Sequence, residues 1–112
     1  MSIEHNIVRE PVNEALPVLK QKLGGYLGHW NGYYIGSSSN VQNRWESHRA
    51  KGWRKMVVLY EAFSAGIAAD IERDLIAWSR ATGFRVEGDN RAPGGEGIRG
   101  DRSRHHIYVL VR

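Results

Sequence analysis

The sequence predicts an α+β fold, in which a small antiparallel sheet of about three or four strands is flanked by helices. At 112 residues and 41% hydrophobic content, the chain (residues 1–112) has room for one domain with a single core. Apolar, β-prone runs occur at 33–35, 56–63 and 106–111. Stretches with apolar residues at helical spacing separate these runs, so the sequence predicts helices between the strands.

The first part of the chain reads as an N-terminal extension, residues 1–23. Residues 1–11 hold a short apolar run ended by Pro11, and this pattern allows either an edge strand or an ordered arm. Leucines at helical spacing from Asn13 onward predict a short helix, which the Gly24-Gly25 pair is expected to end.

A tight β-hairpin is predicted next. Asn31-Gly32 is the strongest short-range hairpin signal in the chain. It predicts residues 26–30 as the outgoing strand and Tyr33-Tyr34-Ile35 as the return strand. The strand at 56–63 is largely apolar, so we expect it to lie centrally in the sheet and to pair with this hairpin.

Two helices and a loop complete the chain before its last strand. Asn40 provides a capping acceptor for a helix over residues 40–51. A stripe of large apolar residues predicts a second helix over residues 68–80. Five glycines and one proline between residues 88 and 100 exclude a regular element there. Residues 88–106 are therefore expected to form a glycine-rich basic loop.

Positive charge is concentrated in two segments. The net charge is +4, and basic residues gather at 40–56 and at 99–112. Such clusters favour a polyanionic partner such as DNA, with simple solubility as the alternative. The candidate DNA-contacting residues are Arg44, Arg49, Lys51, Arg54, Arg99, Arg102 and Arg104.

Cysteine is absent, which excludes disulfides, thiolate metal sites and a cysteine nucleophile. The N-terminal segment has acidic residues and no long apolar run, so we expect neither a signal peptide nor a membrane segment. We therefore expect a cytoplasmic protein without a membrane partner.

One set of residues carries a chemical signature. Tyr34-Ile35-Gly36 is followed by Arg44 ten positions after the tyrosine and by His48 four positions further on. The spacing of four places Arg44 and His48 on one face of the predicted helix. Glu72 lies on the second helix, at the border of its apolar stripe. The alternative is a strand–helix corner in which Tyr34 packs and the arginine and histidine form a solvated face.

This set resembles the second half of the GIY-YIG nuclease signature, and the resemblance covers residues 24–95. Tyr26 then stands where the first tyrosine of that signature normally stands, with Gly25 in place of the isoleucine, and Tyr33 is the adjacent alternative. An asparagine that precedes a Gly-Gly pair resembles the family's supporting asparagine. The resemblance implies that the catalytic residues are Tyr26, Tyr34, Arg44, His48, Glu72 and Asn90.

The resemblance implies a metal-dependent DNA endonuclease that hydrolyses phosphodiester bonds by a one-metal mechanism. Arg44 would clamp the phosphate oxygens, and Glu72 would hold Mg²⁺ or Mn²⁺. The base stays open between a tyrosine and His48, because a tyrosine hydroxyl is mostly protonated at neutral pH. Specificity would come from the loops of the chain, from formation of a homodimer, or from DNA structure.

Two other interpretations are open. The first is a non-catalytic nucleic-acid-binding module on the same fold, in which arginines grip phosphates and Trp45, Trp53 or the tyrosines stack on bases. The second is an unrelated small interaction domain. Cleavage of DNA that depends on Mg²⁺ separates the enzyme from both.

Overall fold

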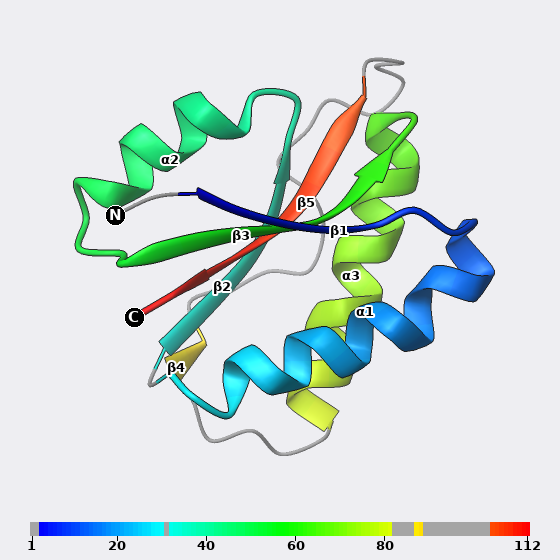
Figure 1. The fold of residues 1–112 in the computed structure, drawn as a ribbon, viewed down its shortest axis with the longest axis horizontal. Coiled ribbons are helices and arrows are strands. Elements are labelled where there is room, and N and C mark those ends of the chain that lie inside the picture. Colours follow the sequence, from blue (N-terminus) through cyan, green and yellow to red (C-terminus); the bar gives the residue numbers. More distant parts are fainter. Residues whose placement is uncertain (1–2, 31, 82–86, 89–103) are drawn as a thin grey trace.

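The computed structural model describes residues 3–30, 32–81, 87–88 and 104–112. It confirms the predicted α+β class: one mixed sheet packed between helices (Figure 1). The strand order is β1-β3-β5-β2-β4. The elements in chain order are β1 (Ile3–Val8), α1 (Val12–Leu27), β2 (Gly32–Ser38), α2 (Val41–Arg49), β3 (Lys55–Ala62), α3 (Ala65–Ala81), β4 (Glu87–Gly88) and β5 (His105–Val111).

The centre of the sheet is antiparallel and its edges are parallel. β5 pairs antiparallel with both β2 and β3, as the predicted antiparallel sheet requires. β1 pairs parallel with β3, and the two-residue β4 pairs parallel with β2, so the prediction of a wholly antiparallel sheet is wrong at both edges. The chain between β1 and β3 contains two helices, which is long enough for the crossover that a parallel pair needs.

The last strand, β5, occupies the middle of the sheet. Ile107 through Val111 are all fully buried, at 0% exposure. A continuous apolar run of this kind suits a strand that is covered on both faces. The predicted strand at 56–63 is confirmed as β3, but it pairs with β1 and β5 and not with β2.

The predicted hairpin is wrong, because residues up to Leu27 belong to α1. The apolar stripe of this helix continues past Gly24 and Gly25 to Leu27, which is only 2% exposed. A glycine inside a helix costs about 1 kcal/mol, whereas burial of one leucine side chain contributes roughly 1.5–3 kcal/mol. Burial of Leu27 therefore offsets much of the unfavourable helix propensity of the two glycines.

The strand that was expected to close this hairpin, β2, takes a partner from the other end of the chain. The backbone N–H of Gly32 donates to the carbonyl of Arg112 at 2.9 Å, and that of Arg112 donates to the carbonyl of Gly32 at 3.2 Å. β2 therefore pairs with β5, and the Asn31-Gly32 signal does not produce a hairpin here.

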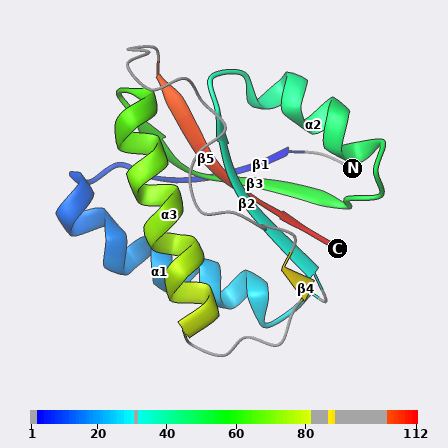
Figure 2. The same ribbon diagram turned by 180° about the vertical axis from the view of Figure 1, so that it is seen from behind.

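The helices cover the two faces of the sheet unequally. Helices α1 and α3 lie together on one face, and α2 lies on the other (Figures 1 and 2). The larger core, under α1 and α3, includes Leu19, Leu23, Tyr33, Ile35, Leu59, Ile71, Leu75 and Val109. The smaller core, under α2, is formed by Trp45, Trp53, Met56, Val58, Tyr108 and Leu110. Alternate residues of β2, β3 and β5 thus belong to different cores.

The two predicted helices around the candidate site are confirmed. Asn40 caps α2, since its side chain accepts a hydrogen bond from the backbone N–H of Asn43 at 3.0 Å. α3 begins three residues earlier than predicted. Residues 1–11 contain an edge strand, which was one of the two predicted alternatives for this segment, the other being an ordered arm. Within the described segments, no helix is long and apolar enough to cross a membrane. Most of the predicted loop at 88–106 lies outside the described residues, but both of its ends are wrong, because Gly88 belongs to β4 and His105 and His106 belong to β5.

Candidate active site

Tyr34, His48 and Tyr108 form an aromatic cluster on the α2 face of the sheet. The ring centroids of Tyr34 and His48 are 5.4 Å apart, and those of His48 and Tyr108 are 6.0 Å apart. The Nε2 atom of His48 lies 3.3 Å from the hydroxyl of Tyr108, within hydrogen-bonding distance. Two hydroxyl-bearing rings and an imidazole therefore share one small region.

Strand register explains why the two tyrosines meet. Gly36 lies opposite Tyr108 in the β2–β5 pair, and Tyr34 precedes Gly36 by two residues on the same face. A Cβ atom added at Gly36 would lie 2.6 Å from the hydroxyl oxygen of Tyr108 and 2.9 Å from Cε1 of Tyr34. Both rings thus occupy the space that any other residue at position 36 would fill.

A polar pocket adjoins this cluster at the start of α2. It has a volume of about 430 Å³ and is lined by Ser38, Ser39, Asn40, Asn43, Arg44 and Ser47. The backbone N–H of Asn40 donates to the hydroxyl of Ser38 at 3.0 Å. Arg44 is half-buried and lies one helical turn before His48 on α2. Hydroxyls, amides and a guanidinium at the N-terminal end of a helix form a suitable site for an oxyanion.

Glu72 lies on the other side of the sheet. Its side chain is on the buried stripe of α3 and is only 1% exposed. Two turns further along this stripe, the hydroxyl of Ser79 lies 2.9 Å from that of Tyr33 on β2. Because α3 and β2 run in opposite directions (Figure 1), two helical turns of about 10 Å bring Glu72 level with Gly36.

The sheet therefore separates Glu72 from Tyr34. β4 pairs with Gly32 and Tyr33 alone, so in the described part of the chain β2 is paired on one side only beyond Tyr33.

The structure does not bring Tyr26 to the cluster. Tyr26 is on α1, where its hydroxyl donates to Glu4 at 2.6 Å and accepts from Asn6 at 3.2 Å. Burial, together with the bond to Glu4, raises its pKa. Tyr33 is buried against α3, because strand alternation sends it to the face opposite Tyr34.

The candidate DNA-contacting residues are placed unequally. Lys51 and Arg54 are exposed at the end of α2 and before β3, and Arg49 is exposed but pairs with Glu46 at 3.4 Å. Arg104 pairs with Glu61 at 3.0 Å at the far end of the sheet. Asn90, Arg99 and Arg102 lie outside the described residues.

Sequence reasoning missed Tyr108, because it sought the second tyrosine before Tyr34 and not in the last strand. The sequence did contain a signal for this tyrosine. Ile107-Tyr108, an isoleucine followed by a tyrosine as in the first half of the GIY-YIG signature, lies in a strongly β-prone run. Only the antiparallel pairing of β2 with β5 shows that this tyrosine lies over Gly36.

His106 was also missed, and it lies on the same face two residues before Tyr108. It is paired between Ser38 of β2 and Glu61 of β3. Its Nδ1 atom is buried and has no hydrogen-bond partner within the part of the chain that the structure describes. Burial lowers its pKa, and the nearby Glu61 carboxylate partly opposes this effect.

The described residues contain no group of three or more His, Cys, Asp or Glu side chains that could hold a metal ion together. Glu72 is a single buried carboxylate, which fits Mg²⁺, an ion that keeps several of its waters and needs few protein ligands.

A scan against protein-family models, a search of curated proteins and a search of solved structures give no match to this chain. The assignment of function therefore depends on the residues of the chain itself.

Proposed function

We propose that this protein is a metal-dependent endonuclease of the GIY-YIG type that hydrolyses phosphodiester bonds of DNA. The observation that carries the proposal is the meeting of Tyr34, His48 and Tyr108 beside a polar pocket that contains Arg44. Hydrolysis of a phosphodiester requires positive charge on the phosphate, a route for the proton of the attacking water, and stabilisation of the leaving oxygen. The cluster and the pocket offer the first two.

The pocket at the start of α2 supports binding of the scissile phosphate. The guanidinium of Arg44 donates two parallel hydrogen bonds to non-bridging oxygens more readily than a lysine would. The surrounding hydroxyl and amide groups of Ser38, Ser39 and Asn43 supply further donors. The phosphate would then lie next to the aromatic cluster, with its charge neutralised for attack.

The pair formed by Tyr108 and His48 supports proton transfer. As the water oxygen bonds to phosphorus, the water loses a proton to the half-buried imidazole of His48, which the hydroxyl of the buried Tyr108 orients from 3.3 Å. The bond from phosphorus to the leaving oxygen breaks with its electron pair, and the imidazolium returns the proton to that oxygen. One proton thus moves from the water to the leaving group.

In this proposal Tyr108 takes the role that the sequence resemblance assigned to Tyr26. Ile107-Tyr108 repeats the isoleucine and tyrosine of the signature's first half, but it does so in the last strand and not before Tyr34. Tyr34 orients the water or the phosphate from the other side of Gly36.

Glu72 is the residue that would hold Mg²⁺ or Mn²⁺. When bound, such an ion supplies Lewis-acid stabilisation of the charge that develops on the phosphate and the leaving oxygen.

A nucleic-acid-binding module without catalysis is the second candidate. The observation that favours it is the burial of Glu72 on the sheet face opposite Tyr34 and His48. Trp45 and Trp53, which that interpretation assigned to base stacking, are only 3% and 6% exposed and belong to the smaller core. Such a module would therefore need other, exposed aromatic side chains on which bases could stack.

Incubation of the purified protein with supercoiled, linear, single-stranded and branched DNA, with Mg²⁺ or with EDTA, tests the proposal. Cleavage that requires Mg²⁺ supports the nuclease. Binding without cleavage of any substrate supports the module, and the absence of both contradicts the two candidates.

Glu72→Gln separates metal binding from DNA binding. The substitution keeps the shape of the side chain but removes the charge that a hard cation requires. We expect normal folding, nearly unchanged DNA affinity and a loss of Mg²⁺-supported cleavage on the order of a hundredfold or more. Cleavage, binding and thermal unfolding should be measured on one preparation. Cleavage at near the parent rate would rule out Glu72 as the metal ligand.

A further inference from the structure

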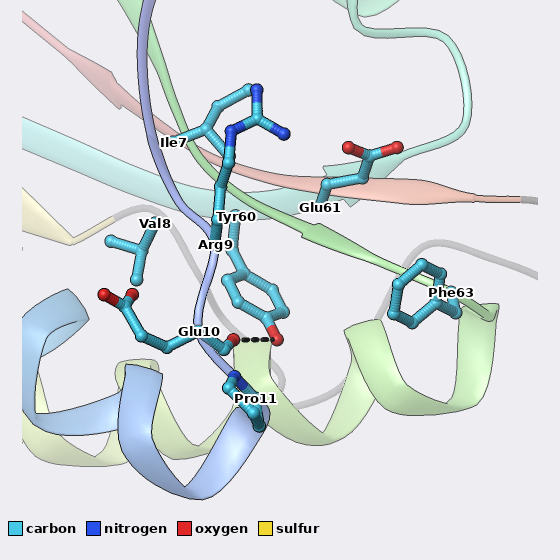
Figure 3. Close-up of a pocket in the computed structure, with 8 residues that line it drawn as sticks. All are labelled: Ile7, Val8, Arg9, Glu10, Pro11, Tyr60, Glu61 and Phe63. Atoms are coloured by element: carbon cyan, nitrogen blue, oxygen red, sulfur yellow. Dashed lines mark hydrogen bonds between the residues drawn. The ribbon is translucent and has the colours of Figure 1, made fainter.

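A second pocket lies where β1 and β3 separate at the end of the sheet (Figure 3). Its volume is about 270 Å³. Ile7, Val8, Pro11 and Tyr60 give it apolar walls, and Phe63 lies at one side (Figure 3). Arg9, Glu10 and Glu61 place charged groups around it. The pocket therefore combines an apolar interior with hydrogen-bonding groups, as small-molecule sites do.

The walls of this pocket are held by the fold. The hydroxyl of Tyr60 donates to the backbone carbonyl of Glu10 at 2.8 Å, which ties the segment after β1 to β3 (Figure 3). The register of the β1–β3 pair is irregular between His5 and Val8, and the pairing resumes at Val8 and Tyr60, which both line the pocket. The hydrogen bond of Tyr60 therefore holds one wall of the pocket in place.

Phe63 is the most exposed large apolar side chain in the described part of the chain, at 68%. The guanidinium carbon of Arg104 lies 5.7 Å from the centre of its ring, and Arg104 also pairs with Glu61. An exposed aromatic ring beside arginine side chains is the arrangement with which proteins stack the bases of single-stranded nucleic acids.

We propose that this pocket binds one unpaired base of the nucleic-acid substrate, stacked on Phe63. The inference rests on the proposed function and narrows its substrate to DNA with a single-stranded or branched segment. Arg9 and Arg104 would contact the phosphates that flank the base. Glu10 and Glu61, which would repel phosphates, suit the amino groups on the edge of a base.

The position of the pocket relative to the aromatic cluster supports this assignment. Glu61 lies opposite His106, which is two residues before Tyr108 on the same strand. One strand spacing and two residues along a strand correspond to a separation of roughly 8 Å between Glu61 and Tyr108. A nucleotide close to the scissile phosphate can therefore reach the pocket.

The test compares binding of three duplexes in EDTA, so that no cleavage occurs: one with a single-stranded tail, one with the same tail made abasic, and one with blunt ends. Fluorescence anisotropy gives the affinities of the parent, Phe63→Ala, Phe63→Tyr and Ile67→Ala. Ile67 is the matched control, since it is also an exposed apolar residue at 36% but does not line the pocket. A 2-aminopurine base in the tail reports stacking directly.

We expect the parent to bind the tailed duplex on the order of tenfold more tightly than the abasic one. Phe63→Ala should abolish that difference and the change in 2-aminopurine emission, whereas Phe63→Tyr and Ile67→Ala should keep both. DNA binding in which the parent does not distinguish a base from an abasic site overturns the base pocket and leaves the nuclease proposal intact. If Phe63→Ala loses the same amount of affinity for the base-containing tail and for the abasic tail, the base pocket is also overturned. Absence of binding to all three duplexes contradicts both proposals.

Discussion

At the scale of single residues, Gly36 leaves the space that the aromatic rings of the proposed site occupy. It lies opposite Tyr108, and the rings of Tyr34 and Tyr108 occupy the space beside it. Nothing in a short sequence motif explains why its last position must be glycine. The contact with a strand that is seventy residues away supplies the reason.

Gly36→Ala should displace both tyrosine rings. The added methyl group would lie within 3.0 Å of atoms in each ring, and such overpacking typically costs about 1–3 kcal/mol. We expect a matching loss of unfolding free energy in urea and a loss of cleavage larger than the change in stability explains. Unchanged stability and cleavage would show that the rings do not lie over Gly36.

The three tyrosines of this region should respond differently to loss of their hydroxyls. Tyr34→Phe and Tyr108→Phe should each lower cleavage on the order of a hundredfold, since both hydroxyls belong to the proposed site. Tyr33→Phe is the control: it removes the bond to Ser79 and should cost about 1 kcal/mol of stability with little effect on cleavage. A larger cleavage defect in Tyr33→Phe than in the other two variants would show that the site lies on the sheet face under α1 and α3 and not on the α2 face.

Helix α1 shows at the scale of elements how burial overrides a local signal. The pattern of glycines and Asn31-Gly32 predicts a helix end followed by a hairpin. Leu19, Leu23 and Leu27 instead form one stripe, at 0–2% exposure, against the sheet. As a result Tyr26 lies on a helix, and β5 takes the place beside β2 that the outgoing strand would have filled.

Gly25→Ala distinguishes the helix from the hairpin. A Cβ atom at this position meets no other atom within 4 Å, and alanine favours a helix interior over glycine by roughly 0.5–1 kcal/mol. We expect the variant to be more stable by about that amount in urea or thermal unfolding. Destabilisation would indicate that residues 24 and 25 do not belong to a helix.

At the scale of the whole molecule, positively charged residues lie around the α2 face of the sheet. Lys51 and Arg54 are exposed at the end of α2 and before β3, and Arg112 stacks over Trp53 with its guanidinium carbon 4.4 Å from the ring centre. Arg104 lies at the opposite end, beside the base pocket. The aromatic cluster lies between this group of basic residues and Arg104.

Salt dependence of DNA binding measures this arrangement. Each phosphate contact that is lost should reduce the slope of log affinity against log salt by about 0.9, so Lys51→Ala with Arg54→Ala should reduce it by roughly 1.8. Arg73→Ala is the control, because Arg73 pairs with Asp70 on α3, the helix that lies on the opposite face of the sheet from α2 (Figure 2). A slope that the double variant leaves unchanged would remove this region from the DNA-binding surface.

The sequence by itself determined the α+β class, the helices at α2 and α3, the strands β2, β3 and β5, and the grouping of Tyr34, Arg44 and His48. These depend on spacing within a few residues, where periodicity and capping act. Tertiary structure alone decided that α1 continues to Leu27, that β5 lies between β2 and β3, and that Tyr108 joins the cluster. Strand pairing is a competition between distant segments for burial, and the outcome of that competition is not encoded in the local pattern of either strand.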